Sequence, residues 1–279
     1  MPYHHRATTN AAAPAPSTTI TNVSTCIISP QAVPRRDHRR RPQQQPSWVG
    51  VKRASRYNLA MKLYWGSGSP VSWRIQIALA LKSTPYSLYR LNLGAHEHRG
   101  DAYRAVNPRG TFPVLTDGDL VLRESLAILA YLERKQPTPP LFGESPETHA
   151  MVWQQVIEHD QGLAADADII TRALFRDGGL DDGTDKTSAA LQRPANELHR
   201  LDKRLQNNDW RSGNAPNALE VVNYPTLQRL LRAASRPHAT HIGLDAAQFK
   251  RDYPGLMDWA DRMVALPGID ATYPPHWRA

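Results

Sequence analysis

The sequence contains a single cysteine, Cys26, among its 279 residues, and it lies near the amino terminus. The chain beyond it can form no disulfide, which excludes a small secreted fold held together by disulfide bridges. That part also has no thiol of its own for nucleophilic or redox chemistry. No apolar run approaches the roughly 18–20 residues that span a bilayer. The sequence therefore predicts a protein without membrane partners.

Acidic residues are nearly absent from the first 60 positions, where Asp37 is the only one. The same segment holds nine of the 34 lysines and arginines, so it accounts for the whole formal charge of +8. Residues 61–279 contain 25 basic and 25 acidic residues. Nucleic-acid binding needs a basic face on the folded part of a protein. The even balance after residue 60 therefore predicts no nucleic-acid partner.

Residues 1–60 are rich in Ala, Pro, Ser, Thr, Gln and Arg, and no helical or strand period persists in them. This composition predicts a disordered basic extension. A segment rich in arginine and hydroxyls and poor in acids is also typical of organelle transit peptides. The other interpretation is a low-complexity extension ahead of a start at Met61. We expect a cytoplasmic protein, or a plastid or mitochondrial one if the segment is a transit peptide.

Regular structure is predicted to begin at Met61. In chain order, the expected elements are a strand at 62–65, a helix at 72–82, a strand at 86–93, a helix at 99–106, strands at 111–116 and 120–123, and a helix at 124–134. The 72–82 helix is expected to turn Ile75, Ala78, Leu79 and Leu81 toward a core. The order β-α-β-α-β-β-α is that of thioredoxin, and a right-handed crossover makes the first two strands parallel.

No strand pattern occurs after the proline-rich linker at 137–145. Helices are predicted over 146–176, 186–207, 217–234 and 254–266. Asn217 and Glu220 have the spacing of a capping box at the start of the third. The predicted fold class is α/β plus all-α: a thioredoxin-like domain over 61–136, followed by a helical domain over 146–279.

Four ordered motifs resemble segments of the soluble glutathione transferases. They are LYWGSGSPVSWR at 63–74, NPRGTFPVL at 107–115, RESLAI at 123–128 and NALEVVNYP at 217–225. The ending YPPHW at 273–277 is similar to the rho-type members, and the Ser-x-x-Ser-Trp-Arg spacing at 69–74 is similar to the zeta type. The resemblance covers about 61–279, and agreement of several ordered motifs is far more specific than any one of them.

The resemblance implies the glutathione transferase carboxyl-terminal helical bundle, a homodimer, and glutathione as co-substrate without a metal. It implies detoxification by conjugation of glutathione to a small hydrophobic electrophile. Two alternatives stay open: a zeta-like glutathione-dependent cis–trans isomerase of the maleylacetoacetate isomerase type, and a non-catalytic protein that binds glutathione or another ligand.

A glutathione enzyme must favour the thiolate, because a free thiol has a pKa of roughly 8.5. A hydroxyl that donates to the sulfur and the N-terminus of the 72–82 helix can both do this. The resemblance places Ser69 at the position of the catalytic serine. Ser67, Ser72 and Tyr64 are rival donors. Ser69 is also suited to capping the helix, and the two roles are compatible.

The resemblance also indicates the residues that bind the tripeptide: Ser72, His98, Thr111, Phe112, Pro113, Glu124 and Ser125. Phe112-Pro113 matches a cis-proline turn whose backbone pairs with extended glutathione. Ser125, at a helix start beside Glu124, is placed to hold the γ-glutamyl carboxylate, and His98 the glycyl carboxylate. His96 and His98 are two ligands without a third, so we expect no metal. Four residues of the first long helix of the second domain are candidates for the electrophile site: Met151, Gln154, Gln155 and His159.

Overall fold

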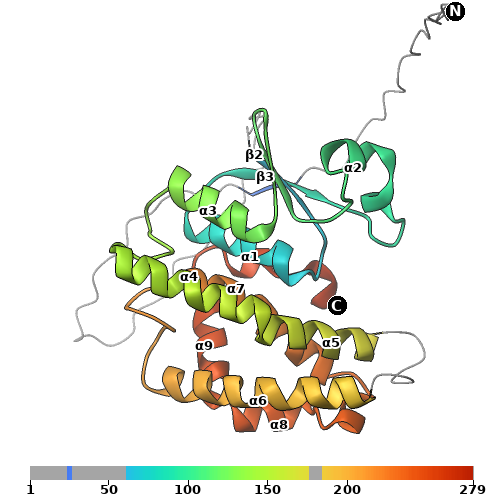
Figure 1. Cartoon of the computed structure of the whole chain (residues 1–279), viewed down its shortest axis with the longest axis vertical. Coiled ribbons are helices and arrows are strands. Elements are labelled where there is room, and N and C mark those ends of the chain that lie inside the picture. Colours follow the sequence, from blue (N-terminus) through green and yellow to red (C-terminus); the bar gives the residue numbers. More distant parts are fainter. Residues whose placement is uncertain (1–23, 27–60, 176–183, 279) are drawn as a thin grey trace, which may run out of the picture.

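The computed structural model describes residues 24–26, 61–175 and 184–278 (Figure 1). A sheet with its helices forms one part, and a bundle of longer helices from residue 146 onward forms the other. This confirms the predicted fold class, a thioredoxin-like domain followed by an all-helical one. Within those ranges, no helix has the combination of length and apolar character that crossing a bilayer requires.

One mixed sheet contains five strands in the order β1-β3-β2-β4-β5. They are β1 (Ser24–Cys26), β2 (Met61–Trp65), β3 (Tyr86–Arg90), β4 (Val114–Asp117) and β5 (Leu120–Arg123). The strands β2 and β3 are parallel, and β4 is antiparallel to both β2 and β5. The predicted parallel pairing of the first two strands and the predicted hairpin are therefore confirmed. The hairpin turns at Gly118, whose φ of +58° glycine adopts without steric cost.

Strand β1 differs from the sequence prediction. Ser24 lies opposite Leu88 and Cys26 opposite Tyr86, so these residues add an antiparallel edge strand to β3. The expectation that all of residues 1–60 lack regular structure is therefore wrong at Ser24–Cys26. Three residues held by backbone pairing are too few to show a periodic pattern. Residues 1–23 and 27–60 lie outside the described part.

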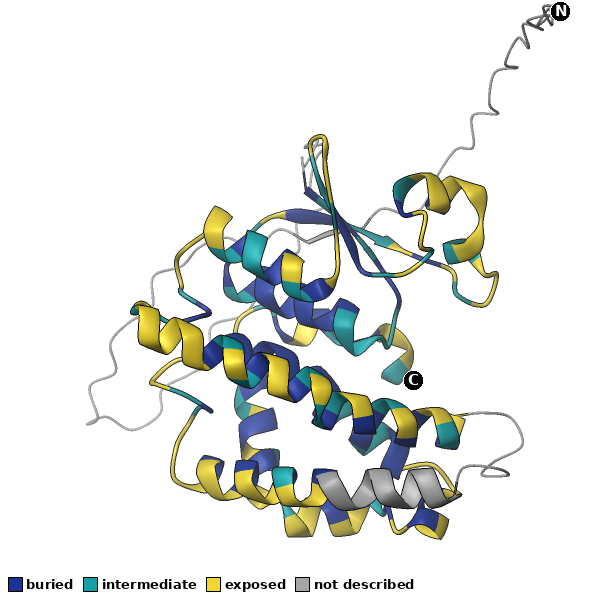
Figure 2. Ribbon diagram, in the orientation of Figure 1, coloured by how far each residue is buried: buried dark blue, intermediate teal, exposed yellow. Residues whose placement is uncertain are grey.

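Helix α1 (Pro70–Leu81) lies between the sheet and the helical part, and Figure 2 shows it buried along most of its length. The sequence predicts that α1 has one apolar face. In the structure, α3 (Ser125–Lys135) of the sheet part and α7 (Ala218–Ala234) of the helical part both pack on α1. As a result Arg74 and Gln76 are buried along with the apolar residues. A helix covered in this way must find partners for its polar side chains inside the protein. The remaining helix of this part, α2 (Asp101–Val106), connects β3 to β4.

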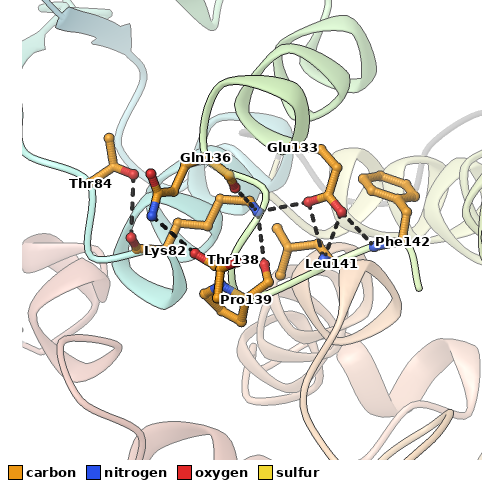
Figure 3. Close-up of polar contacts among 8 residues, drawn as sticks. All are labelled: Lys82, Thr84, Glu133, Gln136, Thr138, Pro139, Leu141 and Phe142. Carbon is orange, nitrogen blue, oxygen red and sulfur yellow. Dashed lines mark hydrogen bonds and ion pairs between the residues drawn. The ribbon is translucent and has the colours of Figure 1, made fainter. Parts of the chain in front are cut away.

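The segment that joins the two parts is tied to the end of α1 by the buried Lys82 (Figure 3). The Lys82 ammonium donates to the carbonyl oxygens of Gln136 at 2.6 Å and Pro139 at 2.9 Å. It also forms an ion pair with Glu133 at 2.7 Å. The Glu133 carboxylate accepts two backbone N–H groups of the linker, those of Leu141 and Phe142. One buried cation thus fixes the path of the chain between the two parts.

The helical part contains α4 (Pro146–Gln161), α5 (Leu163–Phe175), α6 (Thr184–Gln206), α7, α8 (Ala246–Asp252) and α9 (Pro254–Val264). The predicted single helix at 146–176 is wrong, because Gly162 (φ −104°, ψ −101°) leaves the helical region and separates α4 from α5. The seven-residue α8 is too short to give a clear period and was not predicted. The capping box of α7 is confirmed: Asn217 accepts the Leu219 N–H at 2.8 Å, and Glu220 accepts the Asn217 N–H at 2.9 Å.

The end of the chain returns to the amino-terminal part and packs on Trp73, which is buried. The Trp73 indole N–H donates to the Thr272 hydroxyl at 2.7 Å. Three rings contact the indole edge-on, those of Tyr224, Tyr273 and Trp277. Trp73 therefore joins α1, α7 and the carboxyl-terminal segment in one core.

Replacing Lys82 tests how much the linker contact stabilises the fold. We expect Lys82→Met to lower the free energy of unfolding by about 3–5 kcal/mol, because it leaves the Glu133 carboxylate without its cation in a buried site. The measurement is urea denaturation. The control is Arg200→Met, which breaks an exposed ion pair with Glu197 and should cost less than about 1 kcal/mol. Equal losses in the two variants would contradict the role given to Lys82.

Candidate functional site

A cleft of about 510 Å³ lies between the N-terminus of α1 and the helices α4, α5 and α7. Its first wall consists of residues 67–71 together with Arg74 and Phe112. The second wall carries the charged side chains of Asp160, Asp168, Arg172 and Arg229 beside alanines of α5. A cleft with a helix N-terminus at one wall and a mixed apolar and charged wall opposite suits a small anionic group joined to an organic body.

Ser69 lies in this cleft as the N-cap of α1. Its Oγ accepts the backbone N–H of Ser72 at 3.4 Å, and its carbonyl accepts that of Trp73 at 2.9 Å. Since the Oγ serves the helix as an acceptor, its own hydrogen remains available as a donor to a group in the cleft. The partial positive charge of the α1 N-terminus acts at the same point.

Ser67 is the other candidate hydroxyl that lines the cleft. Its Oγ is 2.9 Å from Nδ1 of His276, a residue of the carboxyl-terminal segment. Ser72, in contrast, is completely buried, and its Oγ accepts the Gly66 N–H at 3.4 Å. Ser72 therefore lies behind the wall of the cleft, where its hydroxyl supports the loop before α1.

Tyr64 is not a wall residue of the cleft. Its ring packs against those of Tyr89 and Tyr103, with centroid separations of 5.2 and 5.9 Å, in a small cluster on the sheet. Of the four hydroxyls that the sequence left open, the geometry brings Ser69 and Ser67 to the cleft.

The Phe112-Pro113 peptide bond is cis, as the sequence resemblance predicts. Two donors, Tyr103 Oη and Asn107 Nδ2, each hold the Thr111 carbonyl at 2.6 Å, which fixes the turn. Thr111 itself is exposed, Phe112 is half-buried and lines the cleft, and Pro113 is buried.

Glu124 and Ser125 follow β5 directly, and Phe112 and Pro113 precede β4. Because Val114 pairs with Arg123, these two pairs of residues lie at the same end of the hairpin. Glu124 has a φ of +66°, which is a strained backbone conformation for a residue other than glycine. This backbone conformation directs Ser125 into the first position of α3. Neither residue lines the cleft, and Glu124 makes an exposed ion pair with Arg109 at 3.0 Å.

His98 stacks edge-on against Phe112, with ring centroids 5.9 Å apart. Its Nδ1 is buried and has no hydrogen-bond partner among the described residues. Burial, followed by the positive charges of Arg99 and His96, lowers the pKa of His98 below its usual value. An anion bound beside it would supply the missing partner and favour the protonated ring.

The helical wall of the cleft is organised by two carboxylates that the sequence analysis missed. The Asp160 carboxylate accepts hydrogen bonds from both terminal nitrogens of the buried Arg74, with N···O distances of 2.8 and 2.9 Å. Asp168 holds Arg172 at 2.6 Å and Arg229 at 3.1 Å. The Asp168–Arg172 spacing is a helical ion-pair signal, but nothing in the sequence indicates that Arg229 of α7 meets them.

The predicted electrophile residues do not line the cleft. Met151 and Gln154 are exposed on α4, and Gln155 faces a different pocket. His159 is buried, with Nε2 3.1 Å from the Thr226 hydroxyl. Helix α4 ends at Gly162 and supplies Asp160 to the lining, whereas most of the helical wall comes from α5. Among the described residues, no group of three or more His, Cys, Asp or Glu could hold a metal ion.

Comparisons with known proteins agree with this geometry. The sequence profile of the glutathione S-transferase N-terminal domain matches residues 63–140. Glutathione S-transferase A of Pleuronectes platessa is 28% identical over 225 residues, which cover 78% of this chain and 92% of that protein. The chain belongs to the soluble glutathione S-transferase family. The resemblance inferred from its motifs is confirmed.

A solved structure of a glutathione S-transferase from the clam Laternula elliptica shares the fold, with a TM-score of 0.61 and 26% identity over 78% of this chain and 94% of that one. Maleylacetoacetate isomerase of Pseudomonas aeruginosa is 43% identical, but only over 90 residues. That match covers 31% of this chain and 42% of the isomerase, so the isomerase-like similarity covers less than half of that relative.

The buried His159 predicts a pH dependence of stability. Burial, then the charges of Arg74 and Arg211, holds the pKa of His159 well below its usual value, so the ring is neutral in the folded protein. In the unfolded chain the ring takes up a proton below a pKa of about 6.5. Stability should therefore fall as the pH drops below that value. Between pH 7.5 and 5.5 the loss from this group is about 1 kcal/mol.

Urea denaturation of the parent chain and of His159→Gln at both pH values isolates this contribution. The glutamine can keep a hydrogen bond to Thr226 but does not titrate. We expect the parent to lose about 1 kcal/mol more than the variant on acidification. An identical loss in both would show that His159 is not neutral in the folded state.

Proposed function

We propose that this chain is a glutathione transferase that joins the glutathione thiolate to small electrophiles. The observation that supports this most is the position of Ser69, which caps α1 with its Oγ and leaves its hydrogen free to donate in the cleft. Family membership makes glutathione the expected co-substrate, and the proposed chemistry needs no metal.

In this proposal the sulfur of glutathione binds at the N-terminus of α1. The Ser69 hydroxyl donates to it, and the helix end adds a favourable partial charge. Lowering the thiol pKa by about two units requires only about 2.7 kcal/mol of preferential stabilisation of the anion, the size of one charge-assisted hydrogen bond plus a helix end. The thiol proton passes to solvent, and the thiolate forms a new carbon–sulfur bond to the electrophile. An aryl halide loses halide with the bonding electron pair. In an epoxide or unsaturated carbonyl the displaced electron pair stays on the product, which takes up a proton from water.

The remaining contacts hold the tripeptide. We propose that the backbone at Phe112 pairs with its extended chain, beside Thr111 and Pro113. The N–H and hydroxyl of Ser125, at the start of α3 next to Glu124, receive the γ-glutamyl carboxylate. His98 receives the glycyl carboxylate at its unpartnered Nδ1. Ser72 contributes indirectly, since its hydroxyl holds the loop that carries Ser69.

The electrophile is proposed to lie between α1 and α5, where alanines supply an apolar surface. We expect a homodimer and a cytoplasmic enzyme, as is usual in the family. A transit role for the basic residues 1–60 would instead direct the protein to a plastid or mitochondrion.

A second candidate function is glutathione-dependent cis–trans isomerisation. The Ser-x-x-Ser-Trp-Arg spacing and the partial match to a maleylacetoacetate isomerase favour it. The stoichiometry separates the two: conjugation consumes one glutathione per product, whereas isomerisation turns over with a catalytic amount. Assays of purified protein with aryl halides, epoxides, unsaturated carbonyls and unsaturated diacids decide between them. A protein that only binds glutathione would do neither.

Substituting Ser69 tests the proposed mechanism. Ser69→Ala removes the sulfur donor but leaves the proposed carboxylate contacts, so glutathione affinity should change little. Turnover should fall roughly ten- to a thousandfold, the usual effect of losing one charge-stabilising hydrogen bond. The rising limb of the pH–rate profile should move to higher pH, because more hydroxide is needed to form the thiolate. The measurements are turnover and thiolate absorbance against pH.

Tyr64→Phe is the matched control, because it also removes one hydroxyl but from the cluster outside the cleft. Its rate and titration midpoint should stay close to those of the parent. A Ser69→Ala variant that keeps both quantities unchanged would rule out Ser69 as the donor, and Ser67→Ala would then be the variant to measure.

A further inference from the structure

A second pocket, of about 680 Å³, lies within the helical part, between α6 and the junction of α4 with α5. Helix α6 packs along α5 (Figure 1), and Gly162, which separates α5 from α4, lies on the pocket wall. The apolar side chains of Leu163, Pro194 and Leu201 form part of the lining, and charged side chains form most of the rest. The residues that line this pocket and the proposed glutathione cleft are different, so the two cavities are separate.

Arg211 lies on the wall of this pocket although it is only 7% exposed. A guanidinium has five N–H donors and remains charged at neutral pH. The Nε atom of Arg211 has no hydrogen-bond partner, and its guanidinium forms no ion pair with a described residue. An unpaired charge in a buried site lowers the stability of a fold. Such a group at the wall of a cavity indicates a ligand of opposite charge.

The carboxylate of Glu220 is close to Arg211, but its oxygens are occupied elsewhere. One oxygen accepts the backbone N–H of Arg211 at 2.6 Å, and the other accepts that of Asn217 at 2.9 Å. Glu220 thus serves the start of α7. Burial is the main influence on the Arg211 guanidinium and lowers its pKa, and the negative charge of Glu220 offsets this effect only in part.

Three carboxylates line the pocket, those of Glu158, Asp166 and Glu197. Glu197 forms an ion pair with Arg200 of the same helix at 2.6 Å, and Glu158 accepts a side-chain amide of α4 at 2.8 Å. Asp166 is 3% exposed on α5. None of the three forms an ion pair with the buried guanidinium of Arg211. The described side chains therefore leave the charge of Arg211 without a contacting counterion.

Arg204 of α6 adds a second positive charge to the same pocket. It is exposed and forms no ion pair with a described residue. Its charge is close enough to Arg211 to contribute to lowering the pKa of the buried guanidinium. Two neighbouring cations favour a dianion more than a monoanion. A phosphate monoester carries about 1.5–2 negative charges at pH 7, and the planar guanidinium matches the geometry of its oxygens.

We propose that this pocket is a second ligand site, which binds the phosphate group of a small phosphorylated molecule. Arg211 donates to the phosphate from the buried wall, and Arg204 donates from the exposed side. The organic body of the ligand lies along Leu163 and Leu201. The ligand supplies the counterion that Arg211 lacks, and the site does not depend on the conjugation proposed for the glutathione cleft.

The test measures the melting temperature of the full chain while inorganic phosphate replaces chloride at constant ionic strength. We expect the Tm of the parent to rise by about 5–10 °C when phosphate reaches about a hundred times its Kd. Arg211→Met keeps much of the side-chain volume and removes the charge. Without phosphate this variant should have a higher Tm than the parent, because no unpaired charge is buried. It should lose most of the rise caused by phosphate.

Phosphate also stabilises proteins in general, because it is excluded from their surface. The quantity compared is therefore the difference in Tm rise between the parent and Arg211→Met, from which this effect and any phosphate binding in the glutathione cleft cancel. Acetate at the same ionic strength should give a much smaller difference, since a carboxylate carries one charge. Glycerol phosphate, a small phosphate monoester, should give a difference at least as large as inorganic phosphate does.

Arg204→Gln changes an exposed side chain and keeps the test valid if Arg211→Met does not fold. It should weaken phosphate binding about tenfold, the effect of losing a hydrogen bond to a charged group. The control is Arg134→Gln, which removes the same charge from an exposed arginine of α3 outside the pocket and should bind phosphate as the parent does. An equal Tm rise in the parent and Arg211→Met, unchanged affinity in Arg204→Gln, or an equal difference with acetate would overturn the proposal.

Discussion

The burial of α1 from two sides is the constraint on which the rest of the structure depends. The helix belongs to the sheet-bearing part, yet α7 covers it from the helical part, so the interface between the two parts passes through it. Its polar residues must therefore find partners within the protein. Arg74 finds Asp160 of α4, and Lys82 finds Glu133 and two linker carbonyls. The ion pairs near the two ends of α1 thus orient one part relative to the other.

Because α1 is buried from two sides, a polar group on it that is unpaired among the described residues is unusual. Gln76 lies on this helix between two cations with satisfied ion pairs, yet its amide nitrogen points to no acceptor among the described residues. Ser69, at the half-buried N-terminus of α1, has a hydrogen that the cap does not use. The helix therefore contributes its N-terminus to the proposed glutathione cleft.

Local patterns were enough to predict the hairpin at Gly118 and the capping box at Asn217, because each is determined by a few neighbouring residues. The cis bond before Pro113 was implied by the family resemblance. The patterns failed where distant segments decide the outcome. Nothing local indicates that α7 buries Arg74, that Arg229 meets Asp168, or that His276 reaches Ser67. The break at Gly162 was missed because one glycine in a long helical period is often tolerated.

The central claim is that the N-terminus of α1 holds the glutathione sulfur as a thiolate. The most direct measurement is the number of protons released on binding, obtained by calorimetry at pH 7 in two buffers of different ionisation enthalpy. Free glutathione is mostly protonated at that pH, and a thiol pKa lowered by about two units makes most of the bound form the thiolate. The account therefore predicts that glutathione releases about 0.7 of a proton more than S-methylglutathione, which has no thiol but the same carboxylates. Equal proton release for the two ligands would contradict the account.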